Sequence, residues 1–499
     1  MSTVPLPNDP SLEQLRKRAR RLQRSVRAGD VVALELVASH HPDGAPRDRG
    51  RFSLSAAQLV TARRYGFASW PALKRYLDVV ERYSWNPDQP DDAGAEAPGD
   101  RLCRLACLWY RDDGPQRWAR ARALLAEQPA LSGANIWTAA ATNNFDTAGE
   151  LIAADRSLAV RRGGPFGWCP LHYLVYSRLD RDVPAEAVLG IARLLLEGGA
   201  DPNEGYLWHG LPTPFTLLTG VFGHGELGPD NQPAHPHSGA LARLLLDAGA
   251  DPNDGQALYN RMFEPDNDHL ELLLEYGLGT GDGGPWKARL GGELASPREM
   301  VRGELDWAVA HDQLARVQLL VEHDVDIATP DDDGHTPVEV AALCGNTSIV
   351  AYLLSHGAAA ADLDGVDRLI AAVMAGDRAA ALAFPVATVD ELRARPWLIV
   401  WAAARGRPKP VQLLLELGFD VNAFGRGDVP SEQQWQTALH TAAGDGRLEL
   451  VKLLLAAGAD PNLRDNRFNG PALGWATHNR HDAVARLLAP LTTDLNDSR

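Results

Sequence analysis

The segment from residue 222 to residue 238 gathers the side chains that could do acid–base or metal chemistry. It contains three histidines and two carboxylates, namely His224, Glu226, Asp230, His235 and His237. Imidazole and carboxylate groups are ligands that zinc or iron accepts. No two of these histidines are four residues apart, and Pro233 and Pro236 favour an extended chain, so no helix holds two ligands together. We therefore predict a contact loop or a surface loop, with neither a metal nor a cofactor.

Other chemistry-bearing patterns are sparse. The chain has four cysteines and no Cys-x-x-Cys pair, which favours small buried hydrophobic residues over a metal or redox site. It also lacks a Gly-rich phosphate loop, a His-Glu-x-x-His helix and a Gly-x-Ser-x-Gly elbow. The sequence thus gives no ground for assigning catalytic residues, and an atypical enzyme is kept only as an alternative.

The loop at residues 222–238 interrupts one member of a series of helical pairs. Between Thr437 and Asn462 two short helical runs flank a polar turn, and neither could bury its apolar face alone. Leu439 in the first run precedes Leu453 in the second by 14 positions. The same offset recurs in five further pairs: Leu258–Leu272, Leu305–Leu319, Val338–Tyr352, Ile399–Leu413 and Leu473–Leu487. This constant offset predicts about eleven stacked helix–turn–helix units.

The repeating unit resembles an ankyrin repeat. Residues 437–440, Thr-Ala-Leu-His, are similar to the Thr-Pro-Leu-His start of that repeat. Residues 453–455, Leu-Leu-Leu, and residues 458–462, Gly-Ala-Asp-Pro-Asn, resemble its second helix and its hairpin exit. The resemblance implies an all-α ankyrin-repeat solenoid with short hairpins between the units. It also implies structural hydrogen bonds for His172 and His440 at the junctions between hairpin and helix.

A basic helical segment precedes the repeats. Residues 52–80 resemble a helical leader found ahead of the repeats in bacterial ankyrin proteins, with Ser55 and Ser69 as predicted N-caps. A stretch rich in Asp, Pro, Gly and Ala follows and is typical of a flexible linker. The predicted divisions are the basic leader at residues 1–85, an acidic linker at residues 86–100, the repeat array at residues 101–490 and a tail at residues 491–499.

The charge distribution narrows the choice of partner. Residues 1–85 carry 15 Lys and Arg against 8 Asp and Glu, a balance of +7, so residues 86–499 carry −23 of the total net charge of −16. A long acidic body disfavours nucleic acid and favours a protein partner with a basic surface. No signal peptide and no apolar run of about 18 residues is found, so we expect no membrane segment. We expect a cytoplasmic monomer.

Aromatic side chains mark the predicted contact surface. Seven residues in the segments between repeats could anchor a protein partner: Phe166, Trp168, Tyr206, Trp208, His209, Phe424 and Trp435. In ankyrin proteins these segments project toward the concave face, and exposed Trp and Tyr bury a large area at little entropic cost. The alternative is that the rings pack under neighbouring hairpins.

Two adjacent units are enlarged. The offset grows to 23 positions between Leu171 and Leu194 and to 29 between Phe215 and Leu244, which places extra loops at about residues 177–188 and 222–238 on one edge of the stack. The leading hypothesis is an interaction scaffold or adaptor that holds a protein on its concave face, hairpins and edge insertions. The alternative is an atypical enzyme or small-molecule-binding protein with a pocket beneath the two insertions.

Overall fold

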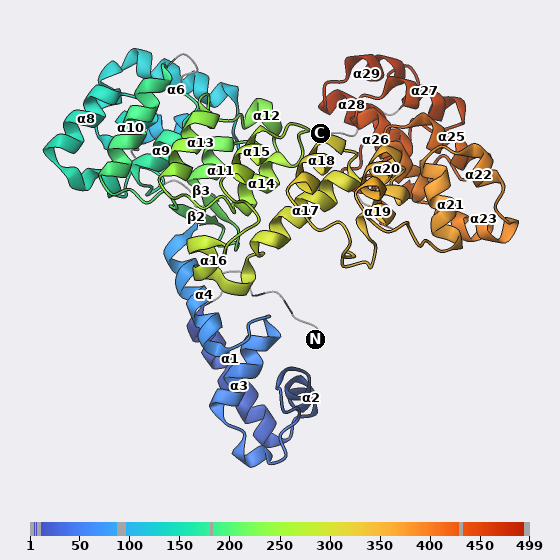
Figure 1. Ribbon diagram of the computed structural model, residues 1–499, viewed down its shortest axis with the longest axis horizontal. Helices are drawn as coiled ribbons and strands as arrows, with labels where there is room; N and C mark the ends of the chain where they lie inside the picture. Colours follow the sequence, from blue (N-terminus) through green and yellow to red (C-terminus); the bar gives the residue numbers. More distant parts are fainter. Residues whose placement is uncertain are drawn as a thin grey trace. The chain divides into compact units, whose positions relative to one another are not determined.

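The structure, a computed structural model, forms two compact units, residues 1–304 and residues 305–499, which are described separately (Figure 1). The residues described are 4, 6, 11–86, 96–179, 183–428 and 433–493. Most of the expected linker (residues 87–95) and most of the expected tail (residues 494–499) lie outside the described residues.

Eleven helical pairs follow one another in the described part of the chain. In the first unit they are α5 (Pro98–Ala106) and α6 (Pro115–Glu127), α7 (Ile136–Ala141) and α8 (Phe145–Ala154), α9 (Pro170–Tyr176) and α10 (Ala185–Glu197), α11 (Leu217–Phe222) and α13 (Ser238–Asp247), and α14 (Gly255–Arg261) and α15 (Asp268–Glu275). The boundary between the units falls within α17 (Pro297–Ala310), which is followed by α18 (Leu314–Glu322). In the second unit the pairs are α19 (Pro337–Leu343) and α20 (Thr347–Ser355), α21 (Gly365–Met374) and α22 (Arg378–Leu382), α24 (Leu398–Ala404) and α25 (Pro408–Glu416), α26 (Ala438–Gly444) and α27 (Leu448–Ala456), and α28 (Ala472–His478) and α29 (Asp482–Leu488). Shorter elements between them are α23 (Val386–Arg393) and the 3-10 helices η2 (Pro129–Gly133) and η3 (Arg156–Val160). The predicted all-α repeat solenoid is confirmed.

Neighbouring pairs share their apolar faces because first helices stack on first helices and second helices on second helices. In the second unit α26 packs against both α24 and α28, while α27 packs against both α25 and α29. Ala402, Ala403, Ala442 and Ala443 are fully buried, which lets the first helices approach closely. Each helical pair therefore buries its apolar face against the neighbouring pairs.

Asparagines at the exits of the second helices tie consecutive repeats together. Asn203 accepts a hydrogen bond of 2.8 Å from the backbone amide of Asp251 and donates one of 2.8 Å to the carbonyl oxygen of Gly249. Asn422 makes the same two bonds to the exit that follows α27, at 2.8 and 3.4 Å. Because these bonds satisfy backbone groups at the tips, they fix the repeat spacing together with core packing.

The leader contains α1 (Leu12–Ala28), α2 (Val31–His40), the 3-10 helix η1 (Arg49–Arg51), α3 (Leu54–Arg64) and α4 (Trp70–Tyr83). The predicted cap of α4 by Ser69 is confirmed, since its hydroxyl accepts the amide of Ala72 at 3.3 Å. The predicted cap by Ser55 is wrong. The hydroxyl of Ser53 accepts the amide of Ala56 at 3.1 Å, so α3 begins one residue before Ser55.

The leader packs against the long connection between α15 and α17. This connection contains α16 (Gly284–Leu290) and the 3-10 helix η4 (Gly291–Glu293). Leu73 and Tyr76 of α4 share one buried cluster with Leu207, Trp286 and Leu290. Figure 1 shows α4 beside α16. The leader thus shares a hydrophobic core with other parts of the first unit.

Short strands complete the hairpins. In the first unit β1 (Ser84–Trp85) pairs in parallel with β2 (Gly205–Trp208), and β2 pairs antiparallel with β3 (Pro214–Thr216). In the second unit β4 (Phe424–Gly425) pairs antiparallel with β5 (Gln436–Thr437). The second edge insertion contains α12 (Gly228–Asn231), while residues 180–182 of the first lie outside the described residues. No helix in the described ranges combines the length and apolarity that crossing a membrane requires.

Candidate functional site

Three of the predicted aromatic anchors lie inside the first unit. Phe166, Trp168 and Tyr206 are 6%, 2% and 4% exposed. The Trp168 ring stacks on Tyr206 with centroids 5.2 Å apart and lies 4.4 Å from the Phe166 ring. Trp85 from β1 adds an edge contact of 5.3 Å to Tyr206. These rings pack under the hairpins, which is one of the two arrangements expected, and a partner cannot reach them in this conformation.

Trp208 and His209 lie at the surface at the end of β2. Trp208 is half-buried, His209 is exposed, and their rings meet edge to face with centroids 4.2 Å apart. The backbone amide of His209 donates to the carbonyl oxygen of Trp85 at 2.8 Å. His209 has a φ of +51°, so this bond helps to hold a left-handed turn that a non-glycine residue adopts at some cost. Both side chains stand where a partner could touch them.

Adjacent hairpins of the second unit carry a cluster that we name the Trp435 patch. It consists of Arg426, Trp435, Arg467 and Phe468. The guanidinium carbon of Arg426 lies 3.7 Å from the centroid of the Trp435 ring. The guanidinium carbon of Arg467 lies 4.7 Å from the same centroid and 5.0 Å from that of Phe468. Cations stacked on aromatic faces in this way form a layered surface that is partly preorganised.

The Trp435 patch is held by the backbone of two hairpins. The amide of Trp435 donates to the carbonyl oxygen of Gly425 at 3.1 Å, and the carbonyl oxygen of Trp435 accepts from the amide of Asn466 at 2.8 Å. Phe468 is 66% exposed. Arg426 pairs with Asp428, whereas Arg467 forms no ion pair with any described residue. Phe424, the remaining predicted anchor, is half-buried in β4.

The histidines of the second insertion are tied to the backbone. His235 is 3% exposed, and its Nδ1 accepts from the amide of His237 at 3.1 Å. Nε2 of His237 lies 2.7 Å from the carbonyl oxygen of Val183. Burial holds the pKa of His235 well below its usual value and lowers the pKa of His224 to about 4. His224 and His235 are therefore uncharged at neutral pH.

The two carboxylates predicted for the alternative pocket point to the surface. Glu226 and Asp230 are exposed, and Glu226 accepts a hydrogen bond of 3.1 Å from the hydroxyl of Tyr259. None of the five residues proposed for that pocket lines either of the two cavities described below. The pocket proposed beneath the two insertions stays a prediction.

A buried arginine that the sequence analysis missed supports both insertions. Arg178 is 5% exposed and donates to the carbonyl oxygens of Gly220 at 2.6 Å and Pro233 at 2.7 Å. It also donates to Val175 at 3.0 Å and Ser177 at 2.8 Å. Burial lowers the pKa of Arg178 to about 10, so the group stays charged at pH 7. The signal in the sequence was a charged residue two positions after the apolar run of α9.

A second buried polar group lies beside Arg178. Asp113 accepts hydrogen bonds of 2.6 Å from Arg117 and 3.1 Å from Gln232. Burial raises the pKa of Asp113, while the Arg117 guanidinium and the Gln232 amide act in the opposite direction. Gln232 belongs to the second insertion, so this carboxylate fixes the insertion to the first helical pair. The arrangement is that of a buried structural network.

The histidines at the repeat starts are structural. Nδ1 of His440 lies 2.8 Å from the hydroxyl of Thr437, and Nε2 lies 3.1 Å from the carbonyl oxygen of Gly470, which confirms the expected junction bond. Nδ1 of His172 lies 3.3 Å from the sulfur of Cys169. Burial lowers the pKa of His172 to about 3, so its imidazole is neutral at pH 7.

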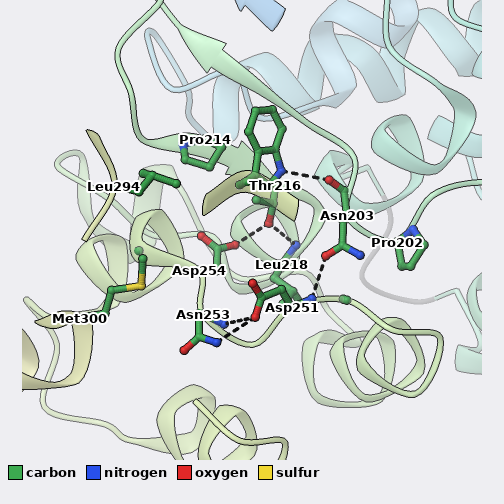
Figure 2. A pocket seen from close by; sticks show the side chains of 13 residues that line it. Pro202, Asn203, Pro214, Thr216, Leu218, Asp251, Asn253, Asp254, Leu294 and Met300 are labelled. Atoms are coloured by element: carbon green, nitrogen blue, oxygen red, sulfur yellow. Dashed lines mark hydrogen bonds between the residues drawn. The ribbon is translucent and has the colours of Figure 1, made fainter. Parts of the chain in front are cut away.

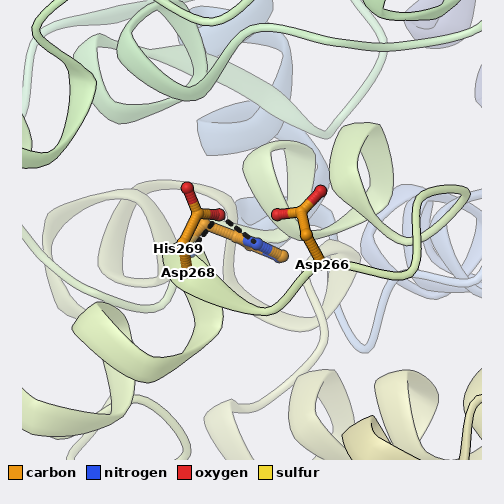
Figure 3. A group of neighbouring side chains, drawn as sticks. All are labelled: Asp266, Asp268 and His269. Carbon is orange, nitrogen blue, oxygen red and sulfur yellow. Dashed lines mark hydrogen bonds and ion pairs between the residues drawn. The ribbon is translucent and has the colours of Figure 1, made fainter.

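Three potential metal ligands gather at the start of α15, as Figure 3 shows: Asp266, Asp268 and His269. Their ligand atoms lie within 4.8 Å of one another. The guanidinium of Arg261 donates to Asp266 and also to Asp268, at 2.6 Å in the latter case. Because an arginine already occupies these carboxylate oxygens, the arrangement fits an ion-paired turn better than a cation site.

A small, partly open cavity lies between hairpin segments of the first unit (Figure 2). Its volume of about 20 Å³ accommodates about one water molecule. The indole of Trp286 donates to the carbonyl oxygen of Asn203 at 3.0 Å, and the hydroxyl of Thr216 donates to Asp254 at 2.5 Å. Burial raises the pKa of Asp254, which the Thr216 hydrogen bond counteracts. The hydrogen bonds around the cavity thus connect hairpin segments of neighbouring repeats.

A wider groove, which we name the acidic groove, adjoins this cavity and shares Gly255, Leu294 and Met300 with it. It has a volume of about 470 Å³ and lies between α14 and the segment formed by η4 and the start of α17. Its lining includes three glutamates and no Lys or Arg among the described residues. The sequence analysis named Leu258 only as a repeat leucine and predicted no site here, because no motif joins the parts of the groove.

Comparison with known proteins identifies the repeats. A family model for ankyrin repeats in three copies matches residues 305–424 and 398–499. The Notch-regulated ankyrin repeat-containing protein of Xenopus tropicalis is 40% identical over 91 residues, which are 17% of this chain and 73% of that protein. The Ankyrin repeat protein nuc-2 of Neurospora crassa is 31% identical over 156 residues, 30% of this chain and 14% of that protein.

A third relative is similar over a shorter stretch. Palmitoyltransferase Hip14 of Drosophila melanogaster is 43% identical over 68 residues, which are 14% of this chain and 10% of that protein. The chain therefore spans only about a tenth of Hip14 and about a seventh of nuc-2.

Proposed function

The chain belongs to the ankyrin-repeat family, and on that premise we propose that it is a scaffold or adaptor that binds a protein partner through its hairpin segments. Ankyrin repeats imply protein–protein interaction. Binding would use preformed side-chain contacts spread over several repeats, which limits the entropy lost on association. We further propose that the chain acts as a monomer in the cytoplasm.

The Trp435 patch is the observation that carries this proposal. Trp435 and Phe468 offer aromatic area at the surface, and Arg467 has no carboxylate partner among the described residues. Aromatic and arginine side chains are the residue types that most often dominate binding energy at interfaces. Trp208 and His209 offer a separate aromatic contact in the first unit.

The net charge of −16 supports a partner whose surface is basic. Opposite charge mainly raises the rate of association and the specificity, while aromatic contacts set the lifetime of the complex. The exposed guanidinium of Arg467 would then meet an individual carboxylate or carbonyl oxygen of that partner.

Affinity capture from host lysate tests the proposal. The wild-type chain, Trp435→Ala, Trp208→Ala and a control variant, Leu354→Ala, are immobilised in parallel, and the recovered proteins are quantified. Leu354 is an exposed apolar residue, whereas Trp435 and Trp208 are half-buried, and it lies on the second helix α20. We expect a specific partner to be lost about 30-fold with Trp435→Ala, as for an interface hot spot of about 2 kcal/mol. Equal recovery of every partner by all variants would contradict the proposed surface.

A further inference from the structure

We propose that the acidic groove of the first unit binds a basic, apolar segment of the protein partner, in which a Lys or Arg side chain stands beside a Leu, Met or Phe side chain. This inference rests on the proposed protein-binding function and adds the chemistry of one contact. It concerns residues outside the predicted aromatic surface.

The charge of the groove selects a cation. Glu293, Glu299 and Glu304 line it, and no lining residue among those described is basic. Glu293 forms no ion pair with any described residue, and burial raises the pKa of its carboxyl group. A Lys or Arg side chain placed beside it would stabilise the ionised form. An anionic ligand, such as an acidic peptide or a nucleic acid, would meet no positively charged side chain among the described lining residues.

The apolar lining of the groove favours a bound segment in which an apolar side chain lies next to the Lys or Arg. Leu258, Met262 and Met300 contribute aliphatic and thioether groups. Methionine side chains adapt their shape to different apolar partners. Tyr259 lies at the rim, 40% exposed, and its hydroxyl donates to Glu226 of the second insertion at 3.1 Å. The groove therefore matches a segment with both charged and apolar side chains better than an isolated cation.

Two glycines keep the groove open. Gly255 begins α14 and Gly303 lies within α17, on opposite walls. A Cβ atom added at Gly303 would meet nothing within 4 Å. A side chain added at Gly303 would therefore start from open space at the wall of the groove. The volume of about 470 Å³ falls within the range of about 300–1,000 Å³ typical of ligand pockets.

The first test uses fluorescence anisotropy with the full chain and a short labelled peptide that alternates Lys and Leu. Two companion peptides replace either Lys by Glu or Leu by Ser. We expect the Lys/Leu peptide to bind at least about tenfold more tightly than either companion, with affinity falling as salt rises. Equal binding of the Glu/Leu peptide would overturn the charge assignment. Equal binding of the Lys/Ser peptide would reduce the groove to a simple cation site and overturn the proposal.

Filling the groove provides the decisive variant. Gly303→Leu should weaken binding of the Lys/Leu peptide at least about tenfold, while helical content is retained because Leu favours a helix more than Gly does. The matched control is Gly239→Leu on α13, where an added Cβ also meets nothing within 4 Å and which lies outside the groove. Unchanged peptide binding by Gly303→Leu would refute the location.

A charge-removing pair tests the glutamates. Glu293→Gln with Glu299→Gln should weaken binding about five- to tenfold at low salt. Glutamine at residue 299 can still accept the backbone amide of Ser296, which Glu299 now accepts at 2.6 Å, so the cap of α17 is kept. The control pair, Glu150→Gln with Glu186→Gln, removes the same charge from exposed positions on α8 and α10. Equal weakening by both pairs would show that only net charge matters.

Two outcomes separate this inference from the proposed function. If peptide binding ignores Gly303→Leu while partner capture still depends on Trp435, the groove assignment fails and the scaffold assignment stands. If the peptide binds in the groove but no partner is captured from lysate, the scaffold assignment fails. A dimer seen by sedimentation that Gly303→Leu dissociates would assign the groove to a second copy of this chain and overturn the partner assignment.

Discussion

The Nε atom of Arg178 donates a hydrogen bond of 2.7 Å to the carbonyl oxygen of Pro233. Arg178 belongs to the first edge insertion and Pro233 to the second, so one guanidinium joins two loops that lie 55 positions apart. The remaining donors of Arg178 are directed at other carbonyl oxygens, including that of Gly220 at 2.6 Å. The two insertions therefore behave as one supported edge of the first unit.

Replacing Arg178 by Lys should loosen that edge. A lysine keeps the charge but cannot supply four donors in the same plane, so some buried carbonyl oxygens lose their partners, at a cost of about 1–3 kcal/mol. Hydrogen–deuterium exchange should rise in residues 219–238. Arg193→Lys is the control, because Arg193 is exposed on α10. Exchange that is equally slow in both variants would contradict the supporting role of Arg178.

Stability of the first unit should fall on acidification through His235. Burial, with Arg178 and His237 nearby, depresses the pKa of His235, so the folded state keeps this imidazole neutral while the unfolded chain takes up a proton below pH 6.5. The stabilising effect is complete above pH 6.5 and is lost as the pH falls toward the folded-state pKa. Between pH 6.5 and about pH 5 the loss should reach about 2 kcal/mol.

The variant His235→Leu isolates this contribution. Urea unfolding at about pH 7.5 and about pH 5 should show a pH-dependent difference smaller by about 2 kcal/mol than in the wild type. His323→Gln, an exposed histidine at the end of α18 in the second unit, serves as the control. If His235→Leu retained the full pH dependence, protonation elsewhere would have to account for it.

Removing the Trp286 ring should release the leader. Trp286 is 5% exposed, and its ring lies 5.1 Å from that of Tyr83 at the end of α4. Trp286→Ala should cost about 3–5 kcal/mol of local stability and speed hydrogen exchange in residues 70–83. Trp286→Phe keeps an aromatic ring and loses the indole bond to Asn203, so its effect should be smaller. Unchanged exchange in α4 with Trp286→Ala would show that the leader does not depend on this contact.

Metal removal should leave stability unchanged. The Arg261 guanidinium occupies the carboxylates of Asp266 and Asp268, so a divalent cation would have to displace it. Thermal unfolding with a chelator and with added zinc should give the same midpoint. A rise of several degrees with zinc would reveal binding to the folded state and would reverse this interpretation.

The repeat architecture was predictable because its sequence signals lie within single repeat units. The offset of 14 positions places Leu258 and Leu272 in α14 and α15, and it places Leu439 and Leu453 in α26 and α27, as the structure confirms. Helical periodicity recurs in successive units, and the exit Gly-Ala-Asp-Pro-Asn occurs at residues 199–203, 249–253 and 458–462. Both signals lie within single units and need no knowledge of distant contacts.

Contacts between distant segments escaped prediction. Trp168 lies in a segment between repeats, as expected, but its exposure depends on the ring of Trp85 and on Tyr206. The acidic groove likewise needs Met262 and Glu293 to be brought together by helix packing. Residue types and spacing give no signal for such contacts, because each residue has a local sequence that is also found where no such contact forms.

The parallel pairing of Ser84 and Trp85 with Leu207 and Trp208 has a practical meaning for anyone trimming this protein. A shortened version starting at residue 87 would strip a strand from the hairpin and bare the apolar surfaces of Leu207 and Trp286 that the leader now shelters. Unpaired strand edges and fresh apolar patches promote self-association. Aggregation of such a fragment would therefore reflect the loss of the leader's packing contacts. It would give no information about the natural binding partners.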